Sequence, residues 1–207
     1  MNLLIVAATK FEIEPFFKEK TLAEILITGV GIPATVYHLT KKLSSEKYDF
    51  VIQAGIAGSF SDEFNLAEVV QVKEDTFADL GIEEKGNFRT LFDMGFINKS
   101  DFPFTNGWLM NPAAFSEKNN LPFAKGITVN KIGDDQLQNK MIREKFLPDI
   151  ESMEGAAFHY VCLQQKNNFL QLRSISNRVG ERDKSKWKLK ESIENLNKEL
   201  LKIIENF

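Results

Sequence analysis

The stretch that decides the fold is FVIQAGIAG at residues 50–58, an apolar run that ends in a pair of glycines. Residues 50–54 predict a buried strand, and Gly55 and Gly58 predict that this strand ends in a turn. Small residues in such a turn let the backbone approach a flat ligand and offer it amide groups. The stretch contains neither the dinucleotide fingerprint G-x-G-x-x-G nor the Gly-Lys-Ser/Thr of a phosphate-binding P-loop. It therefore predicts a ligand site at a strand end without predicting a nucleotide phosphate.

Short apolar runs and helical patterns alternate on both sides of this stretch. The further predicted strands are Leu3–Ala8, Ile25–Thr28, Glu68–Val72, Ile127–Ile132 and Phe169–Ser174. The predicted helices are Ala34–Leu43, Asp135–Phe146, Met153–Lys166 and a final amphipathic helix with Ile193, Leu196, Leu200 and Ile203 on its apolar face. Residues 81–120 are rich in glycine, asparagine, proline and phenylalanine and predict loops. The pattern predicts the α/β class, with residues 1–207 forming a single three-layer domain whose central mixed β-sheet is flanked by helices.

Composition excludes several classes of function. The 207 residues are 43% hydrophobic, enough for one sizeable core, and 26 basic against 29 acidic residues give a net charge of −3. Because no basic block interleaved with aromatic residues occurs, we expect no nucleic acid partner. The apolar start lacks a basic n-region, and no apolar run approaches the roughly 20 residues that span a bilayer. Together with a lone cysteine, these features predict a cytoplasmic protein with no membrane partner.

Three polar clusters follow or end predicted strands, where ligands of α/β sheets bind. Glu12 follows the first strand; its carboxylate can reach a ligand in the crevice or can simply favour the first turn of a helix. Met153 and Glu154 suit a sugar, because a thioether packs on the ring face while a carboxylate accepts from two hydroxyls, although charges at a helix start are also common. Asn177 ends the last strand with an amide that both donates and accepts, as the edge of a purine requires.

The combination of these segments resembles the purine nucleoside phosphorylase and nucleosidase superfamily. The resemblance rests on Glu12, the 55–58 turn, SMEGAA at 152–157 and RSISN at 173–177, which in this order span nearly the whole chain. Within the superfamily, SISNRVG at 174–180, RDKSKW at 182–187 and FADLG at 77–81 look most like the futalosine hydrolase family. The combination of these motifs is specific for the superfamily, whereas no single motif is. The resemblance implies a nucleoside phosphorylase-like fold.

The resemblance also implies roles for individual residues. Glu12 matches the glutamate that activates water, with Glu14 as the fallback, Met153 and Glu154 match the pair that holds the ribose, and Asn177 matches the purine-facing position. The remaining substrate contacts are expected at Gly55, Ile56, Ala57, Gly58, Val129 and Trp187, with Phe104 as a further aromatic candidate. No cofactor and no metal are expected. The candidate ligands His38, His159 and Cys162 lie in helical patterns and are interpreted as structural.

Two departures from superfamily patterns favour water as the nucleophile and hypoxanthine as the leaving base. Gln53 precedes the glycines where phosphorolytic members carry an arginine for phosphate, and Asn177 stands where nucleosidases of 6-aminopurines carry an aspartate. The expected activity is hydrolysis of the N-glycosidic bond of futalosine, which releases hypoxanthine and dehypoxanthine futalosine in menaquinone biosynthesis. A nucleosidase of methylthioadenosine, adenosylhomocysteine or aminodeoxyfutalosine is the nearest alternative. A phosphorylase and an inactive nucleoside-binding relative are further alternatives.

The expected partners are a small-molecule nucleoside and further copies of the chain. Relatives form dimers or larger homo-oligomers, and the phenylalanine-rich stretch 88–123 is a candidate for such a surface, although burial within its own subunit is equally consistent. Four cations near the predicted site are candidates for holding the acid substituent of futalosine, or else belong to a solvated loop: Arg178, Arg182, Lys184 and Lys186.

Overall fold

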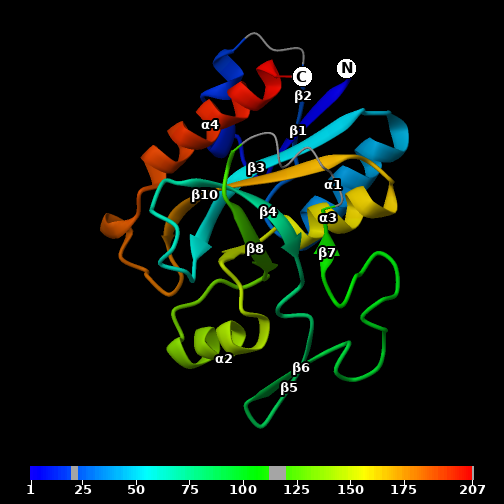
Figure 1. Cartoon of the computed structure of the whole chain (residues 1–207), viewed down its shortest axis with the longest axis vertical. Helices are drawn as coiled ribbons and strands as arrows, with labels where there is room; N and C mark the ends of the chain where they lie inside the picture. Colours follow the sequence, from blue (N-terminus) through cyan, green and yellow to red (C-terminus); the bar gives the residue numbers. More distant parts are fainter. Residues whose placement is uncertain (20–22, 112–119, 207) are drawn as a thin grey trace.

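The computed structural model describes residues 1–19, 23–111 and 120–206, so the part of the phenylalanine-rich stretch at 112–119 lies outside the described residues. The longer strands are β1 (Leu3–Ala7), β2 (Glu24–Ile27), β3 (Phe50–Ser59), β4 (Val69–Asp75), β8 (Phe123–Thr128), β9 (Ile150–Ser152) and β10 (Phe169–Arg178). The helices are α1 (Ile32–Ser45), α2 (Gln136–Phe146), α3 (Gly155–Gln164) and α4 (Leu189–Glu205) (Figure 1). Shorter elements are β5 (Gly81–Glu84), β6 (Asn87–Thr90), β7 (Leu109–Met110) and the short 3₁₀ helices η1 (Phe11–Ile13), η2 (Phe16–Lys18) and η4 (Lys184–Lys186).

The sheet is mixed, as predicted, but part of it closes on itself. Its order is β10-β4-β8-β9-β3-β1-β2, and β10 also pairs in parallel with β3, which joins β3, β10, β4, β8 and β9 into a ring. One edge of β3 pairs with β1 over its first half and with β9 at its end, while β10 follows its other edge. The expectation of an open three-layer sheet therefore needs correction, because a strand this long shares its twist with partners on both edges and allows barrel-like closure.

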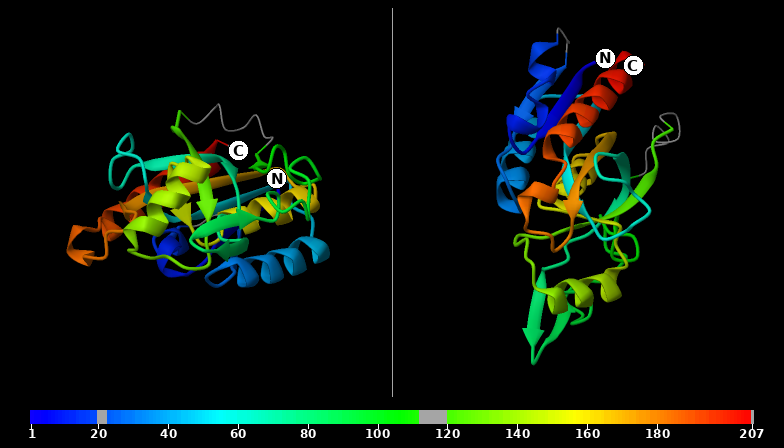
Figure 2. Two further views of the ribbon diagram at one scale, coloured as in Figure 1. Left: turned by 90° about the horizontal axis from the view of Figure 1, so that it is seen from below. Right: turned by 90° about the vertical axis from the view of Figure 1, so that its left-hand side faces the viewer.

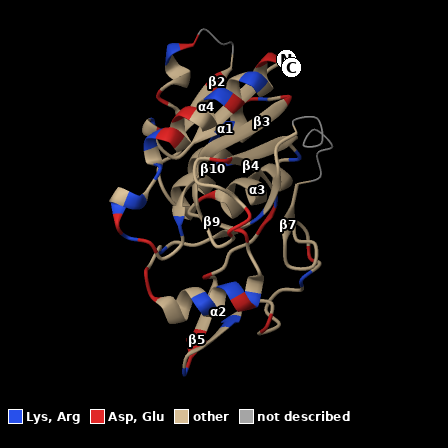
Figure 3. Ribbon diagram, turned by 60° about the vertical axis from the view of Figure 1, so that its left-hand side comes forward, with Lys and Arg blue, Asp and Glu red and all other residues tan. Residues whose placement is uncertain are grey.

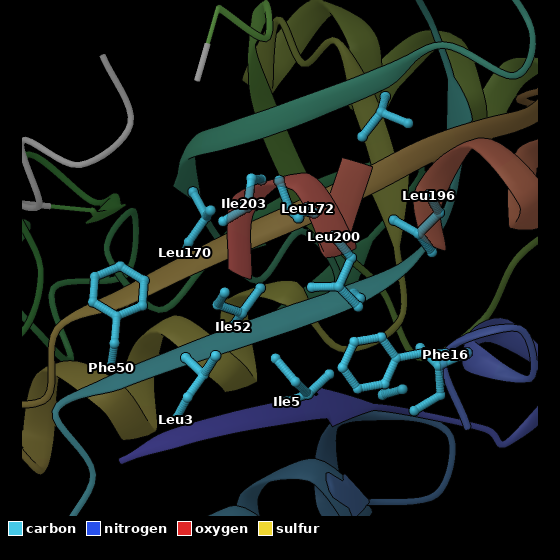
Figure 4. Close-up of a cluster of buried hydrophobic side chains, with 14 residues drawn as sticks. Leu3, Ile5, Phe16, Phe50, Ile52, Leu170, Leu172, Leu196, Leu200 and Ile203 are labelled. Carbon is cyan, nitrogen blue, oxygen red and sulfur yellow. The ribbon is translucent and has the colours of Figure 1, made fainter. Parts of the chain in front are cut away.

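Helices cover both faces of the β1–β3 part of the sheet (Figure 2). Alternate residues of β1 point to opposite faces, so Leu3 and Ile5 pack in one apolar cluster and Leu4 and Val6 in another. Figure 4 shows the first cluster, which α4 covers with the apolar face predicted from its spacing: Leu196, Leu200 and Ile203. The second cluster joins α1 and α3 to the sheet through Leu39, Leu43, Phe158 and Val161.

Several segment boundaries differ from the prediction. β3 continues through Ser59, so the glycines at 55–58 lie inside a strand and not in a turn. The strand predicted at 127–132 is β8, which starts four residues earlier and ends at Thr128. It leaves the sheet there because the carboxylate of Asp79 accepts hydrogen bonds from the backbone and side chain of Asn130. The short strand β9 and the β5–β6 hairpin were not predicted.

The helix α2 and the β5–β6 hairpin lie at the end of the molecule opposite both termini (Figure 1). The side chain of Asp135 caps α2 by accepting from the backbone amides of Leu137 and Gln138. Lysine, arginine, aspartate and glutamate residues recur along α2 and α4, whereas most of the length of the central strands carries none of them (Figure 3). Within the described ranges, no helix combines the length and apolar character needed to cross a bilayer.

A buried polar cluster joins the end of β4 to the start of α3. The carboxylate of Asp75 is fully buried and accepts from the Thr128 hydroxyl at 2.9 Å and from the Gln171 amide at 3.3 Å. Burial raises the pKa of Asp75 to about 7, although these hydrogen bonds and the charge of Arg173 act in the opposite direction. A Cβ atom at Gly155 would lie 2.1 Å from Asp75 Oδ2, so the helix can begin here only with a glycine.

The raised pKa of Asp75 makes the stability of the fold depend on pH. Its carboxyl gives up a proton near pH 3.8 when unfolded and near pH 7 when folded. The folded chain therefore binds more protons between these values, and this contribution to the free energy of unfolding is lost as pH rises from about 4 to about 7. In Asp75→Asn, which keeps the shape and an acceptor for Thr128, we expect a smaller decline over this range. Denaturant titrations of both proteins at several pH values measure the difference, and parallel curves would contradict the assignment.

Candidate active site

A cavity of about 330 Å³ lies at the carboxyl ends of the parallel strands β1, β3 and β10. The predicted site residues that line it are Glu12, Ile56, Ala57, Gly58, Met153, Glu154, Asn177 and Trp187. A larger cavity of about 560 Å³ between the β5–β6 hairpin and α2 contains none of them. The fold thus brings together in space most of the residues that the motifs singled out along the chain.

Four other candidates lie elsewhere. Gly55 packs beneath the buried side chain of Arg173, and Val129 is 2% exposed and packs in an apolar cluster with Ala78. Glu14, the fallback base, borders a separate cavity. Phe104 stacks edge-on against the ring of Phe92.

Glu12 is held from three sides. Its Oε2 accepts from the backbone amide and the hydroxyl of Thr9, at 2.9 and 3.0 Å, and its Oε1 accepts from the Ile56 amide at 3.3 Å. The side chain of Asn197 in α4 donates to the Glu12 carbonyl at 2.9 Å and fixes the backbone. Burial raises the pKa of Glu12, the nearby charge of Arg173 lowers it, and the charge of Glu154 raises it. A carboxylate with a raised pKa and a fixed position is suited to accept a proton.

Arg173 is the cation that lies between the two carboxylates. It is 1% exposed, donates to Gln53 Oε1 at 3.0 Å, and its Nη1 lies 3.5 Å from Glu154 Oε2. The other oxygen of Glu154 accepts from the Gly31 amide at 3.0 Å. A Cβ atom at Gly55 would lie 2.3 Å from Arg173 Nη1 and 3.0 Å from Glu12 Oε1, so this glycine makes room for the ion pair.

Arg173 lies within the motif RSISN at 173–177, but the sequence alone indicated no role for it. The available signal was an arginine inside the otherwise strand-like run FLQLRSIS at 169–176, because an arginine in a buried strand is almost always paired. What the sequence did not show is that Glu12, more than 150 positions away, is within reach of its charge.

Asn177 reaches the cavity from an irregular part of β10. A β-bulge between Ile175 and Asn177 shifts the pairing with β3, and bulges redirect side chains. The amide nitrogen of Asn177 donates to the Arg178 carbonyl at 2.9 Å, and its oxygen accepts from the Ser176 hydroxyl at 2.8 Å. Since the carbonyl requires a donor, these contacts fix which end of the amide is nitrogen. No described residue accepts the second amide hydrogen, which can therefore be donated to a ligand.

The mouth of the cavity is formed by the segment between β10 and α4. The indole nitrogen of Trp187 donates to the Glu181 carbonyl at 3.0 Å, and the guanidinium of Arg182 lies 6.0 Å from the Trp187 ring. Both residues line the cavity. Two other cations named in the sequence analysis are differently placed: Arg178, at the end of β10, donates to the Ser61 carbonyl, and Lys186 of the mouth segment pairs with Glu181 at 2.7 Å.

The candidate metal ligands are separated from this cavity. In the described part of the chain, no group of three or more histidine, cysteine, aspartate or glutamate side chains is arranged to hold a metal ion. His159 is buried in α3, with its Nδ1 2.9 Å from the Leu109 carbonyl oxygen, and burial lowers its pKa to about 4. Cys162 is also buried, which raises the pKa of its thiol.

Comparisons with known proteins identify the family of the chain. The model of the Phosphorylase superfamily matches residues 18–207, a range that begins after Glu12. A futalosine hydrolase of Thermus thermophilus is 28% identical over 173 residues, which cover 81% of this chain and 75% of the relative. One of Streptomyces coelicolor is 29% identical over 177 residues, covering 82% and 73%. A 5′-methylthioadenosine/S-adenosylhomocysteine nucleosidase of Bacillus velezensis is 29% identical over 169 residues, covering 76% and 68%.

Solved structures share the fold. A mutant Helicobacter pylori MTAN with 5′-methylthioadenosine in its active site superimposes with a TM-score of 0.83 at 15% identity, covering 100% of this chain and 99% of the other. The futalosine hydrolase of Helicobacter pylori also gives 0.83, at 14% identity, with coverage of 100% and 98%. At these identities the likeness shows the fold alone.

Removing the shared cation tests how strongly the site depends on it. In Arg173→Met, two buried carboxylates lose the charge between them, and we expect the free energy of unfolding at neutral pH to fall by about 3–5 kcal/mol. Arg178→Met is a matched control in the same strand, because the partner of Arg178, Asp62, has a fully exposed side chain. Its loss is expected to be about 1 kcal/mol or less. Equal losses in urea unfolding of the two variants would contradict the role of Arg173.

Proposed function

The chain belongs to the phosphorylase superfamily, and from this premise we propose that it hydrolyses the N-glycosidic bond of futalosine and releases hypoxanthine and dehypoxanthine futalosine. The observation that carries the proposal is the single cavity in which Glu12, Glu154 and Asn177 meet. The futalosine hydrolases among its relatives support the choice of substrate. The reaction requires a general base that accepts a proton from water, a side chain that binds the ribose and a hydrogen bond to the leaving purine. The cavity offers one residue for each of these three tasks.

Glu12 is proposed as the general base. Cleavage of an N-glycosidic bond passes through a transition state with oxocarbenium character, in which water attacks the anomeric carbon as the base departs. The Glu12 carboxylate takes a proton from this water. The hydrogen bonds from Thr9 and Ile56 fix its position, and burial raises its pKa while the charge of Arg173 limits that rise.

Glu154 and Met153 are proposed to hold the ribose. Arg173 and the Gly31 amide engage the two oxygens of Glu154 and leave further lone pairs of the carboxylate for vicinal hydroxyls. Met153 lines the cavity beside it and packs on the ring face. Asn177 donates its free amide hydrogen to the N7 and O6 edge of the purine, where negative charge grows as the bond breaks. Trp187 and the backbone at 56–58 complete the proposed contacts.

Water is proposed as the nucleophile instead of phosphate. Gln53 stands where phosphorolytic relatives carry an arginine, and its side-chain oxygen is bound by Arg173. This contact holds the Gln53 side chain against the buried guanidinium. Gln53 is therefore not positioned to donate a hydrogen bond to a phosphate anion. Acceleration of cleavage by phosphate would overturn this part of the proposal.

The wider biological setting is proposed with the reaction. We propose that the enzyme acts in menaquinone biosynthesis and that it does so in the cytoplasm. We further propose that residues 1–207 act as a single domain and that the chain forms a homo-oligomer. Size-exclusion chromatography with light scattering tests the last point, and a monomer at micromolar concentration would contradict it.

The second candidate is a nucleosidase of 6-aminopurine nucleosides, favoured by the methylthioadenosine/adenosylhomocysteine nucleosidases among the relatives. The purified protein, free of phosphate and metal, is incubated separately with futalosine, aminodeoxyfutalosine, methylthioadenosine and inosine, and released base is measured by chromatography. Hypoxanthine from futalosine supports the proposal. Faster adenine release from methylthioadenosine would replace it with the second candidate.

Replacement of Glu12, the proposed general base, provides the sharpest test of the mechanism. In Glu12→Gln, which keeps size and hydrogen bonding, we expect kcat for futalosine to fall about 100-fold to 10,000-fold because the proton acceptor is lost. The wild-type activity should fall at acid pH, with a midpoint above the ordinary pKa of a glutamate, since burial raises the pKa of Glu12. Glu14→Gln serves as the control, because Glu14 borders another cavity and should retain full activity. Equal loss in both variants would exclude Glu12 as the base.

Arg182 is proposed to bind the acid substituent of futalosine, because it is the cation of the mouth segment that lines the cavity. In Arg182→Gln we expect KM for futalosine to rise about 10-fold, the value of a charge-assisted hydrogen bond of roughly 1.5 kcal/mol, with kcat little changed. Inosine lacks the acid substituent, so its kinetics should not change. Lys184→Gln, in the same segment but outside the cavity lining, is the control. An equal effect on both substrates would show that Arg182 acts on the fold of the segment.

A further inference from the structure

A second cluster of polar side chains lies outside the lining of the cavity and has no part in the proposed mechanism. Asp75 in β4, His159 in α3 and Gln171 in β10 are each 0% exposed. Two glycines make room for the carboxyl group, because a Cβ atom at Gly126 or Gly155 would lie 2.8 or 2.1 Å from Asp75 Oδ2. Polar groups at this depth need hydrogen-bond partners.

The amide of Gln171 connects the other two side chains. Its Nε2 lies 3.3 Å from Asp75 Oδ2, which is long for a hydrogen bond to a charged acceptor. Gln171 also interacts with the ring of His159, which lies one helical turn after Gly155, where the amide nitrogen packs. In this orientation, Gln171 Oε1 and His159 Nε2 have no hydrogen-bond partner among the described residues.

A backbone contact fixes which nitrogen of His159 carries a hydrogen. Nδ1 lies 2.9 Å from the Leu109 carbonyl oxygen, and because a carbonyl only accepts, Nδ1 is the donor. Nε2 of a neutral ring then has a lone pair and no hydrogen. The ring is neutral because burial, together with the charge of Arg173, lowers the pKa of His159 to about 4. Nε2 therefore needs a donor, and the oxygen of Gln171 cannot supply one.

Reversing the two ends of the Gln171 amide supplies that donor. The ends have the same shape, so the hydrogen-bond network decides between them. In the reversed orientation the nitrogen donates to His159 and the oxygen faces Asp75 Oδ2. Two acceptors meet there unless Oδ2 carries a proton. Oδ1 is already engaged, since the Thr128 hydroxyl donates to it at 2.9 Å and accepts from the Ala156 amide at 2.7 Å.

We propose that Asp75 carries a proton in the folded enzyme and donates it in a hydrogen bond to Gln171. The hydrogen bonds then run in one direction, from the Gln171 amide to His159 and from His159 to the Leu109 carbonyl. Both of the unpaired atoms gain a partner, and none of the three side chains carries a buried charge.

The ionisable groups that face Asp75 come from two elements. Arg173 in β10 is the cation whose charge acts on it, and His159 in α3 is reached through Gln171. Lys125 of the neighbouring strand β8 pairs with Glu74 at 3.7 Å instead. Burial outweighs the attraction of Arg173, because the pKa of Asp75 is raised to about 7. The protonated acid is therefore the stable form in mildly acid solution.

The proton on Asp75 affects the active site through Arg173. Side chains two residues apart in a strand point to the same face, so Gln171 and Arg173 lie side by side. The charge of Arg173 acts on Glu12, and its guanidinium pairs with Glu154 at 3.5 Å. An ionised Asp75 would attract the same guanidinium, whereas a protonated one leaves it to the cavity. Asp75 is thus a positioning residue, a role that rests on the proposed function, whereas the position of the proton does not.

Infrared spectroscopy detects the proton without requiring turnover. The carbonyl stretch of a carboxylic acid differs from that of a carboxylate, and subtracting the spectrum of Asp75→Asn from that of the wild type isolates the band of Asp75. At about pH 6 we expect an acid band, which disappears with a midpoint near pH 7. Asp93→Asn is the matched control and should give a carboxylate band, because the pKa of Asp93 is about 2. A carboxylate band for Asp75 at this pH would overturn the inference.

Nitrogen NMR tests the direction of the chain. The protein has two histidines, so His38→Gln leaves His159 as the only source of the ring signals. At about pH 6 we expect a hydrogen on Nδ1 and an accepting Nε2. Adding Gln171→Met should shift the Nε2 signal toward that of an unbonded lone pair and leave Nδ1 nearly unchanged. Hydrogens on both nitrogens, or an Nε2 signal insensitive to Gln171→Met, would overturn the inference.

The pH dependence of cleavage tests the positioning role. Above about pH 7 we expect wild-type kcat for futalosine to decline about 3-fold to 10-fold as Asp75 ionises, the scale of one weakened hydrogen bond. Asp75→Asn, which offers Gln171 a permanent donor, should lack this decline. Glu151 in the cavity also has a pKa of about 7, so a decline that persists in Asp75→Asn and is lost in Glu151→Gln would overturn the role of Asp75. Absence of cleavage by the wild type would overturn the proposed function, while both spectra would still test the proton.

Discussion

The burial of the Arg173 guanidinium among polar groups of β3, β10 and the start of α3 is the constraint on which the site depends. A cation at this depth needs acceptors, and Gln53, the Ile56 carbonyl and Glu154 supply them for its two Nη atoms, whereas Nε has no partner among the described residues. Gln53 and Ile56 lie in β3 and Glu154 lies at the start of α3, so Arg173 meets these partners only because β10 runs beside β3. The closed sheet provides this pairing, and the cavity forms where it ends.

The space required by buried polar side chains explains Gly55 and Gly155 better than turn formation does. Gly55 lies beneath Arg173 and Glu12, and Gly155 lies against Asp75 and Gln171. Neither adopts the left-handed conformation that only glycine tolerates well; each is needed because a Cβ atom would occupy the space of a buried polar side chain. Glycine within a strand commonly marks the close approach of another group. Here the approaching groups are the ones proposed to act on the substrate.

The sequence predicted features that depend on local interactions and missed features that depend on contacts between distant segments. Local periodicity located α4 and β1 closely, because the apolar spacing of Leu196 and Leu200 is a property of the helix itself. Closure of the sheet was not predicted, since it depends on the pairing of β10 with both β3 and β4. The end of β8 was misplaced because a contact with Asp79, about 50 positions earlier, removes Asn130 from the sheet. Glu12 and Asn177 were located by resemblance, whereas the contacts of Arg173 required the three-dimensional arrangement.

The charges around the cavity divide it into two unlike halves. Glu12 and Glu154 share Arg173, so two carboxyl groups lie within reach of one guanidinium. Negative charge on these carboxyl groups favours a sugar ring that gains positive charge in the transition state. Burial and the charge of Asp79 raise the pKa of Glu151, and no described cation lies beside it. The three carboxyl groups of the cavity thus differ, because Glu12 and Glu154 lie near Arg173 and Glu151 does not.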